Sequence, residues 1–259
     1  MKHPFYKYQG TGNDFIVIDN RLQEFDKINA KLIERLCDRK FGIGADGLIL
    51  LEDHGSLDFK MVYFNADGNQ SSMCGNGGRC IVHFAKFLGI IEEHAHFEAI
   101  DGEHHAKIID DLVHLQMQNV DQIKSLNGDF ILDTGSPHFV RPVQEVKQID
   151  VAQEGAKIRY SDAYKVEGIN VNFVEELGND KFAVRTYERG VENETLSCGT
   201  GVTAMALAMH SLGKVSDDEA ILQTEGGTLR VTFQSTASGY NNIWLIGPAV
   251  QVFKGEIEW

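Results

Sequence analysis

The feature that most constrains the fold of this chain is an internal sequence repeat. Cys74-Gly-Asn-Gly and Cys198-Gly-Thr-Gly lie 124 residues apart, and an offset of 123 carries Thr11-Gly-Asn onto Thr134-Gly-Ser. Further pairs recur at the offset of 124: Tyr63 and Tyr187, Leu88 and Leu212, Gly89 and Gly213, and Gly102 and Gly226. A register kept over so many positions indicates an internal duplication, which sets the architecture before any single motif does.

Each copy is expected to combine strands with one helix. Runs rich in β-branched and aromatic residues predict strands at 15–18 and 59–64 in the first copy, and at 138–140 and 182–187 in the second. The predicted helices span 77–88 and 202–212, and each is followed by a glycine in the position of a helix C-cap. An amphipathic helix over 29–37 is expected to cover the surface.

The two repeated helices are apolar around most of their circumference, which is typical of a helix buried on all sides. We therefore predict an α+β fold of two pseudo-symmetric α/β domains that arise from the duplication. Each is expected to be a mixed or antiparallel, barrel-like sheet around a central buried helix. The predicted domains are 1–118, completed by a C-terminal strand at 250–259, and 119–249. We expect the halves to pack face to face.

Charge and cysteine content narrow the class of protein. The net charge is −14, with no run of lysine and arginine, so neither nucleic acid nor a membrane surface is an expected partner. No segment resembles a signal peptide or a membrane span. The four cysteines follow neither a disulfide framework nor metal-site spacing, so we expect a reduced cytoplasmic protein. Cys37 and Cys80 are interpreted as core residues.

Cys74 and Cys198 both stand directly before a glycine-rich turn into a buried helix. The first N–H groups of a helix lack intrahelical acceptors, and together with the helix dipole they favour negative charge. A thiol in that position is expected to ionise more readily than a free cysteine. The amides of Gly75-Asn76 and Gly199-Thr200 could hold a carboxylate and stabilise charge that develops on it.

Two matched thiols suit the inversion of a stereocentre, because one group must remove a proton while another delivers one to the opposite face. A thiol hydrolase would need a single nucleophile with a histidine partner, which leaves the second cysteine unexplained. A zinc site would need more than the two cysteines, with His138 and Glu188 as the obvious additions. The pattern favours a cofactor-independent epimerase or racemase and no metal.

Seven segments, in order along nearly the whole chain, resemble the diaminopimelate epimerase family. They are Gln9-Gly-Thr-Gly-Asn-Asp-Phe15, Gly42-Ile-Gly-Ala-Asp-Gly47, Asn65-Ala-Asp-Gly68, Met73-Cys-Gly-Asn-Gly-Gly-Arg-Cys80, Gly135-Ser-Pro-His138, Tyr187-Glu-Arg-Gly190 and Ser197-Cys-Gly-Thr-Gly201. As a set these motifs are highly specific, although any one alone is weak.

This resemblance implies the interconversion of LL- and meso-2,6-diaminopimelate on the route to lysine and peptidoglycan, without pyridoxal phosphate or metal. It implies Cys74 and Cys198 as the acid/base pair, with His138 and Glu188 as supporting residues that tune their pKa values. The implied substrate-binding residues are Asn13, Asn65, Gly75, Asn76, Asn172, Glu188, Arg189, Gly199 and Thr200. Expected partners are a small amino-acid substrate and, in a homodimer, a second copy of the chain.

Two positions depart from the family pattern: Ser136 stands where many members have asparagine, and Gly47 where some have glutamine. Two other functions remain open. A two-cysteine racemase acting on a substrate such as proline would not need Arg189 and the asparagine set. A non-catalytic binding protein on the same scaffold should lack one cysteine. Four clustered histidines are interpreted as a solvated hairpin rather than a metal tract: His94, His96, His104 and His105.

Overall fold

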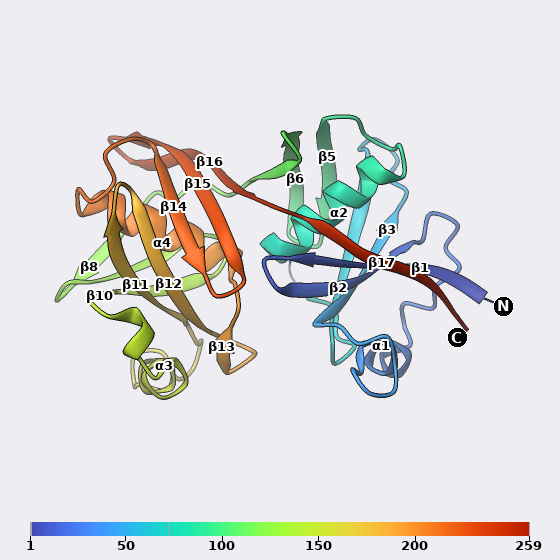
Figure 1. Ribbon diagram of the computed structural model, residues 1–259, viewed down its shortest axis with the longest axis horizontal. Helices are drawn as coiled ribbons and strands as arrows, with labels where there is room; N and C mark the ends of the chain where they lie inside the picture. Colours follow the sequence, from blue (N-terminus) through green and yellow to red (C-terminus); the bar gives the residue numbers. More distant parts are fainter. Residues whose placement is uncertain (1, 72, 259) are drawn as a thin grey trace. The chain divides into compact units, whose positions relative to one another are not determined.

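The structure is a computed structural model that describes residues 2–71 and 73–258 (Figure 1). These residues form two compact units. The first contains the described residues up to Leu115 together with those from Gly247 onward, and the second spans Gln116–Ile246. The outermost bounds expected for the domains, residues 1 and 259, lie outside the described residues. Among the described residues, no helix has the length and apolar character needed to cross a bilayer.

The first unit is a mixed sheet with two helices. Its elements are β1 (Lys2–Gly10), β2 (Asn13–Asp19), α1 (Ala30–Cys37), β3 (Gly47–Glu52), β4 (Phe59–Asn65), α2 (Gly75–Phe87), β5 (His94–Ala99), β6 (Gly102–Ile109), β7 (Leu112–Gln116) and the returning β17 (Val250–Glu258). Strand β1 pairs antiparallel with both β17 and β2. The pairings β2–β3 and β4–β5 are parallel, whereas β3–β4, β5–β6 and β6–β7 are antiparallel.

The second unit repeats this plan. Its elements are β8 (Lys124–Leu126), β9 (Asp129–Asp133), β10 (Pro137–Val143), the 3-10 helix η1 (Val146–Gln148), α3 (Val151–Arg159), β11 (Asn170–Gly178), β12 (Lys181–Glu188), β13 (Asn193–Thr195), α4 (Gly199–Ser211), β14 (Glu219–Thr224), β15 (Gly227–Thr236) and β16 (Gly239–Gly247). Parallel pairings again join the second strand to the third (β10–β11) and the fourth to the fifth (β12–β14). The other pairings along the series β9–β16 are antiparallel.

The two units thus follow one pattern of pairing, in which β1–β7 correspond to β9–β12 and β14–β16. The repeated helix occupies the same place in each, since α2 follows β4 and α4 follows β12 and the short β13. β17 pairs with β1 as β8 pairs with β9. The predicted duplication and the predicted α+β fold class are therefore confirmed.

Each repeated helix is buried among the strands of its own unit (Figure 1). Helix α2 contacts β1, β2, β3, β4 and β6, and α4 contacts β9, β10, β11, β12, β14 and β15. In α4 every residue from Gly201 to Met209 is buried. Gly89 and Gly213, one residue beyond the C-caps, have φ of 71° and 70°, a left-handed conformation that glycine adopts without strain. The prediction of two central helices closed by glycine is confirmed.

Two peripheral elements agree with the predictions from the sequence, and a third was not predicted. Helix α1 buries Ile33, Leu36 and Cys37 and exposes its remaining face, as its amphipathic spacing predicts. The clustered histidines lie on the β5–β6 hairpin, where His96 and His105 stack. Helix α3 was not among the predicted elements. It begins at an N-cap, Asp150, whose side chain accepts a hydrogen bond from the Gln153 N–H.

Candidate active site

Both predicted catalytic cysteines are helix N-caps. Cys74 precedes α2 with φ −93° and ψ 129°, and Cys198 precedes α4 with φ −121° and ψ 112°. Neither side chain makes a capping hydrogen bond to the helix backbone. Each cysteine therefore lies at the positive end of a helix dipole without its sulfur being used as a cap. The two positions are equivalent in the duplication. The other two cysteines are buried, and burial raises the pKa of both Cys37 and Cys80 to about 12.

In the first unit an amide connects the cysteine to the helix start. The Cys74 Sγ donates to Asn13 Oδ1 at 3.5 Å, and Asn76 Nδ2 donates to the same oxygen at 3.3 Å. Asn13 Nδ2 donates to Asp46 Oδ2 at 2.7 Å, which fixes the orientation of the amide. Asn65 ends β4 beside Gly47 in the register of β3 and β4. The predicted residues Asn13, Gly75 and Asn76 therefore lie together at Cys74.

Gly47 has a local reason for being glycine. A Cβ at this position would lie 2.5 Å from the Phe64 carbonyl oxygen and 2.6 Å from the Tyr63 ring. Both distances are shorter than real Cβ contacts, so a side chain here would force β3 and β4 apart. The departure from the family pattern at this position is therefore matched by close packing of the neighbouring strand.

In the second unit a buried histidine lies next to the helix start. His138 on β10 has no exposed surface, and burial lowers its pKa to about 3, so the ring is neutral. Asn172 Nδ2 donates to His138 Nδ1 at 3.1 Å, and Asn172 Oδ1 accepts from the Thr186 hydroxyl at 3.0 Å. The proton of the ring is therefore on Nε2, which has no hydrogen-bond partner among the described residues.

The Asn172 amide of this pair lies against the first turn of α4, the helix that Cys198 precedes. A Cβ added to Gly201 would lie 2.5 Å from Asn172 Oδ1 and 3.4 Å from Cys198 Sγ, so glycine lets the amide approach the first turn of α4. Cys198 Sγ lies 3.5 Å from the Thr200 hydroxyl, and only 9% of the Cys198 residue is exposed. The predicted residues Gly199 and Thr200 thus lie at this cysteine, and His138 reaches the same helix turn through Asn172.

A second group of residues surrounds Arg189 at the end of β12. Its backbone N–H donates to Asn170 Oδ1 at 2.9 Å, and its Nη2 donates to Ser136 Oγ at 3.4 Å. Asn170 Nδ2 in turn donates to Ser136 Oγ at 2.8 Å. Glu188, the preceding residue, accepts from the Thr195 hydroxyl at 2.9 Å. Arg189 is exposed, and although its Nη1 donates to the Glu167 carbonyl at 3.0 Å, the guanidinium is accessible to an anion.

Asn170 is the residue that sequence reasoning missed. It lies two positions before the predicted substrate residue Asn172, and it is Asn170 that contacts Ser136 and Arg189. Asn172 is fully buried and its amide is committed to His138, Phe139 and Thr186. The available signal was the interval of two, because strand alternation places Asn170 on the same face as the predicted Asn172.

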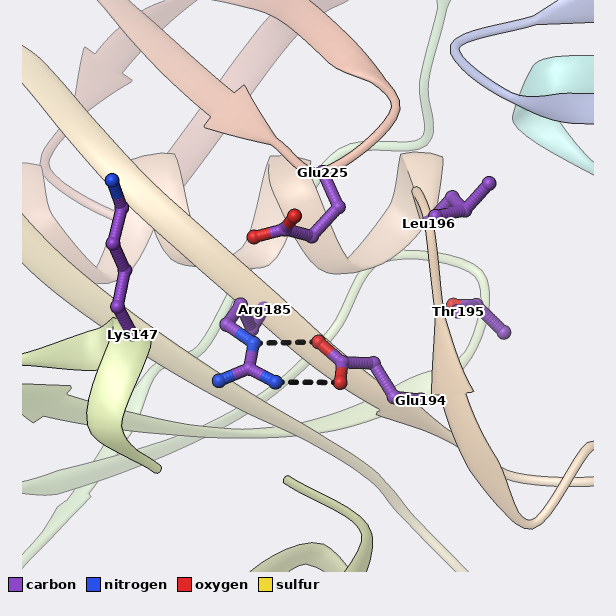
Figure 2. A pocket seen from close by; sticks show the side chains of 6 residues that line it. All are labelled: Lys147, Arg185, Glu194, Thr195, Leu196 and Glu225. Atoms are coloured by element: carbon purple, nitrogen blue, oxygen red, sulfur yellow. Dashed lines mark hydrogen bonds and ion pairs between the residues drawn. The ribbon is translucent and has the colours of Figure 1, made fainter. Parts of the chain in front are cut away.

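The second unit also holds a cavity of about 430 Å³ that the predicted site residues do not line (Figure 2). Its lining residues are Lys147, Arg185, Glu194, Thr195, Leu196 and Glu225. Arg185 pairs with both carboxylate oxygens of Glu194, at 2.6 and 2.7 Å, and caps two carbonyls next to η1. Its guanidinium therefore has a structural role. Among the described residues, no three or more His, Cys, Asp or Glu side chains are grouped to hold a metal ion.

Comparison with known proteins gives one family across both units. Residues 5–122 and 130–252 match the family described as diaminopimelate epimerase. The chain is 57% identical over 253 residues to a diaminopimelate epimerase of Flavobacterium psychrophilum, covering 97% of this chain and 99% of that protein. It is 43% identical to one of Chlorobaculum tepidum, covering 96% of this chain and 98% of that protein.

Solved structures extend the likeness in fold. A phenazine biosynthesis protein of the PhzF family from Bacillus anthracis superposes with a TM-score of 0.80 at 14% identity, over the whole of both chains. A hydroxyproline epimerase from Agrobacterium vitis gives a TM-score of 0.68 at 15% identity, covering 99% of this chain and 92% of that one. At these identities the likeness shows a common fold.

Proposed function

We propose that the chain, which belongs to the diaminopimelate epimerase family, interconverts LL- and meso-2,6-diaminopimelate by a two-base mechanism that needs no cofactor. The observation that carries the proposal is the matched pair of N-cap cysteines, one in each unit, neither of which uses its sulfur to cap the helix. A non-catalytic relative would have no reason to keep both.

In this mechanism one cysteine begins as a thiolate and the other as a thiol. The thiolate takes the α-proton and becomes a thiol, which leaves a carbanion at the α-carbon. The second thiol donates its proton to the opposite face and becomes the thiolate. One proton is removed and one is delivered, so the configuration inverts and the enzyme is left with its charge on the other sulfur. Proton exchange then restores the starting state.

The carbanion needs its charge spread onto the neighbouring carboxylate. The first amides of α2 and α4, at Gly75-Asn76 and Gly199-Thr200, suit this because helix N-termini stabilise anions. The neutral His138, joined through Asn172 to the first turn of α4, adds a buried Nε2–H donor. A neutral N–H donor stabilises developing negative charge through a hydrogen bond and keeps its own proton.

The distal end of the substrate carries a second amino group and carboxylate. Arg189 offers a planar guanidinium suited to a carboxylate, and Asn170 and Ser136 hold its backbone and side chain in place. Glu188 can balance the distal ammonium group. Proline lacks both distal groups, which is why we place diaminopimelate ahead of proline as substrate.

Purified protein with LL-diaminopimelate, L-proline or L-lysine, followed by separation of stereoisomers, tests the proposal. Cys74→Ala and Cys198→Ala should each abolish epimerisation, because one face then lacks its proton carrier. Cys80→Ala is the matched control, since Cys80 lies in the same helix and its equivalent in the second unit is Ala204. Turnover of Cys198→Ala at the parent rate would contradict the mechanism.

Arg189→Lys tests the distal contact, because it keeps the charge and loses the fork. We expect kcat/KM on diaminopimelate to fall by about tenfold or more, equivalent to about 1.4 kcal/mol. Arg230→Lys on β15, where the arginine pairs with Glu219, is the control and should leave kcat/KM unchanged. Comparable rates on L-lysine and diaminopimelate would refute the role of Arg189.

We further propose that the protein acts in the cytoplasm as a homodimer. A mechanism that depends on two reduced thiols favours a reducing compartment. Val252 and Phe253 on β17 expose 56% and 47% of their surfaces, which is apolar area that a second copy would cover. Light scattering of the purified protein measures the oligomeric state, and a strictly monomeric protein would refute this part.

A further inference from the structure

Arg79, in the second turn of α2, is an arginine with no exposed surface. Its guanidinium donates to the Gly75 carbonyl at 3.3 Å, to Asn76 Oδ1 at 3.0 Å, to the Thr11 hydroxyl at 3.3 Å and to the Pro248 carbonyl at 3.3 Å. Every one of these acceptors is neutral. Buried charges are ordinarily paired, because an uncompensated charge in a protein interior is costly. The burial of Arg79 among neutral groups therefore calls for an anion nearby.

The ionisable neighbours of Arg79 are thiols. Burial lowers the pKa of its guanidinium, and Cys80 and then Cys74 act in the opposite direction, although an arginine stays protonated in any case. Cys80 is fully buried, and burial raises the pKa of its thiol to about 12, so it does not supply the anion. Cys74 is only half-buried and begins the helix whose first carbonyl Arg79 holds.

The second unit makes the same contact without the charge. The offset of 124 residues that carries Cys74 onto Cys198 carries Arg79 onto Thr203. Thr203 is also fully buried, and its hydroxyl donates to the Gly199 carbonyl at 3.0 Å, the equivalent of the bond from Arg79 to Gly75. Helix α4 contains neither lysine nor arginine. The two helix starts therefore differ by one buried positive charge.

Other charged groups near Cys74 are balanced among themselves. Lys7 on β1, Asp14 on β2, and Arg39 and Asp46 in the loop before β3 form a chain of ion pairs at 2.7 Å with no net charge. Tyr8 on β1 and His83 on α2 are neutral, because burial raises the pKa of the phenol and lowers that of the ring. These groups leave the charge of Arg79 uncompensated.

Two features act against an anion at Cys74. Asp101, in the β5–β6 turn, lies near the Met73 backbone, but it pairs with His104 at 3.1 Å and its side chain is 44% exposed, so solvent screens it. Asn13 Oδ1 accepts from the Cys74 thiol, and ionisation would lose that bond. An exposed, paired carboxylate and one amide dipole are weaker than a full charge buried away from solvent.

We propose that Arg79 is a positioning residue that makes Cys74 the resting thiolate and leaves Cys198 the resting thiol. The inference rests on the proposed function, in which one thiolate and one thiol are needed at the start of each turnover. After a turnover that leaves the charge on Cys198, the same buried guanidinium favours its return to Cys74. The duplication thus supplies two similar thiols, and the Arg79/Thr203 difference assigns their roles.

The wild-type protein gives the first test. Alkylation with iodoacetamide over a pH series, with each cysteine followed by peptide mass spectrometry, yields a midpoint that depends on ionisation and not on access. We expect the midpoint of Cys74 to lie below that of Cys198. A midpoint for Cys198 equal to or below that of Cys74 would overturn the inference, whether or not the protein epimerises diaminopimelate.

Two variants separate charge from structure. Arg79→Gln keeps a hydrogen-bond donor and removes the charge, whereas Arg79→Lys keeps the charge and loses the fork. We expect Arg79→Gln to slow alkylation of Cys74 by about tenfold below its midpoint and to move the acid limb of kcat/KM to higher pH. Arg79→Lys should retain both properties, and Cys198 should be unaffected in either variant.

A purely structural role for Arg79 predicts the reverse pattern, in which both variants lose Cys74 reactivity and thermal stability alike and the pH profile keeps its shape. Thr203→Val is the matched control in α4 and should leave both midpoints unchanged. If Arg79→Gln does not fold, the wild-type midpoints and Arg79→Lys still decide the question. Different midpoints without diaminopimelate epimerisation would refute the proposed function and leave the charge asymmetry standing.

Discussion

At the scale of single residues, His138 shows how the fold sets chemistry that the sequence names only by position. The residue follows a Ser-Pro pair, as a surface turn histidine could. In the structure it is fully buried on β10, and Asn172 fixes its tautomer from β11 through the parallel pairing of the two strands. The ring is consequently a neutral donor rather than a base.

The buried His138 should make stability depend on pH. Its native pKa of about 3 lies below the 6.5 of an unfolded histidine, so between these values the unfolded chain binds the additional proton. Its contribution is complete above pH 6.5 and is lost as pH falls towards 3, at up to about 1.4 kcal/mol per pH unit. Urea unfolding from about pH 4 to 7 measures this slope. His138→Gln should flatten it, and equal slopes in the two proteins would contradict the prediction.

Some site residues could be predicted from local sequence motifs, and others depend on contacts between strands that the sequence does not show. Cys74 and Cys198 were identifiable because a duplicated glycine motif fixes them at helix starts. Asn170 was missed because two asparagines at an interval of two lie on one face of a strand, so strand alternation does not choose between Asn170 and Asn172. Only the start of the strand, set by its pairing with β10, separates their roles.

At the scale of elements, the first turn of α4 is shaped by glycine at Gly201. The φ of Gly201 is not in the left-handed region, so glycine is needed here for space. A Cβ at this position would lie only 2.5 Å from Asn172 Oδ1. Gly213, at the other end of the same helix, presents the opposite case. A Cβ there would meet nothing within 4 Å, but φ is 70°.

These two glycines make a paired prediction. Gly201→Ala should displace Asn172 and with it His138, so we expect kcat to fall by about tenfold or more. Gly213→Ala should cost about 1 kcal/mol of unfolding free energy through backbone strain and leave kcat unchanged. Steady-state kinetics and thermal unfolding of both variants provide the measurements. Parent-like kinetics for Gly201→Ala would show that the His138–Asn172 contact does not support turnover.

The predicted elements were those whose pattern does not depend on tertiary contacts. Helices α2 and α4 are long, apolar and closed by glycine, so their periodicity and their ends are local signals. Helix α3 has nine residues, of which only Val151 and Gly155 are buried, so its apolar pattern is weak. Its stability comes from packing on β11, β12 and β13. A Cβ on Gly155 would clash with Tyr187 at 2.4 Å, a contact that no local pattern encodes.

At the scale of the whole molecule, duplication supplies the two thiols that the proposed mechanism uses as proton carriers. One unit that buries a helix behind an N-cap cysteine places one thiol at the positive end of a helix, and repeating the unit places a second thiol in a similar extended backbone setting. Divergence then acts on the surroundings. Arg79 holds the first carbonyl of α2, and Asn172, which bonds His138, lies against the first turn of α4. The repeat provides the two matched thiols that the proposed inversion requires, while these residues distinguish the two units.

The last prediction follows from what the two-base mechanism demands of the complete protein. Each sulfur must reach one α-carbon from opposite sides at about 3–3.5 Å, so with substrate bound the sulfurs would be roughly 6–7 Å apart. A disulfide needs the sulfurs to lie ~2.05 Å apart, which a substrate standing between them prevents. Mild oxidation of the substrate-free protein should therefore form a Cys74–Cys198 bond and abolish activity, and a thiol reductant should restore it. Diaminopimelate or an unreactive analogue should protect against the loss.

Peptide mapping of the oxidised protein identifies the bond. A cross-link through Cys37 or Cys80, or loss of activity with Cys74 and Cys198 still reduced, would show that the two thiols do not serve one carbon.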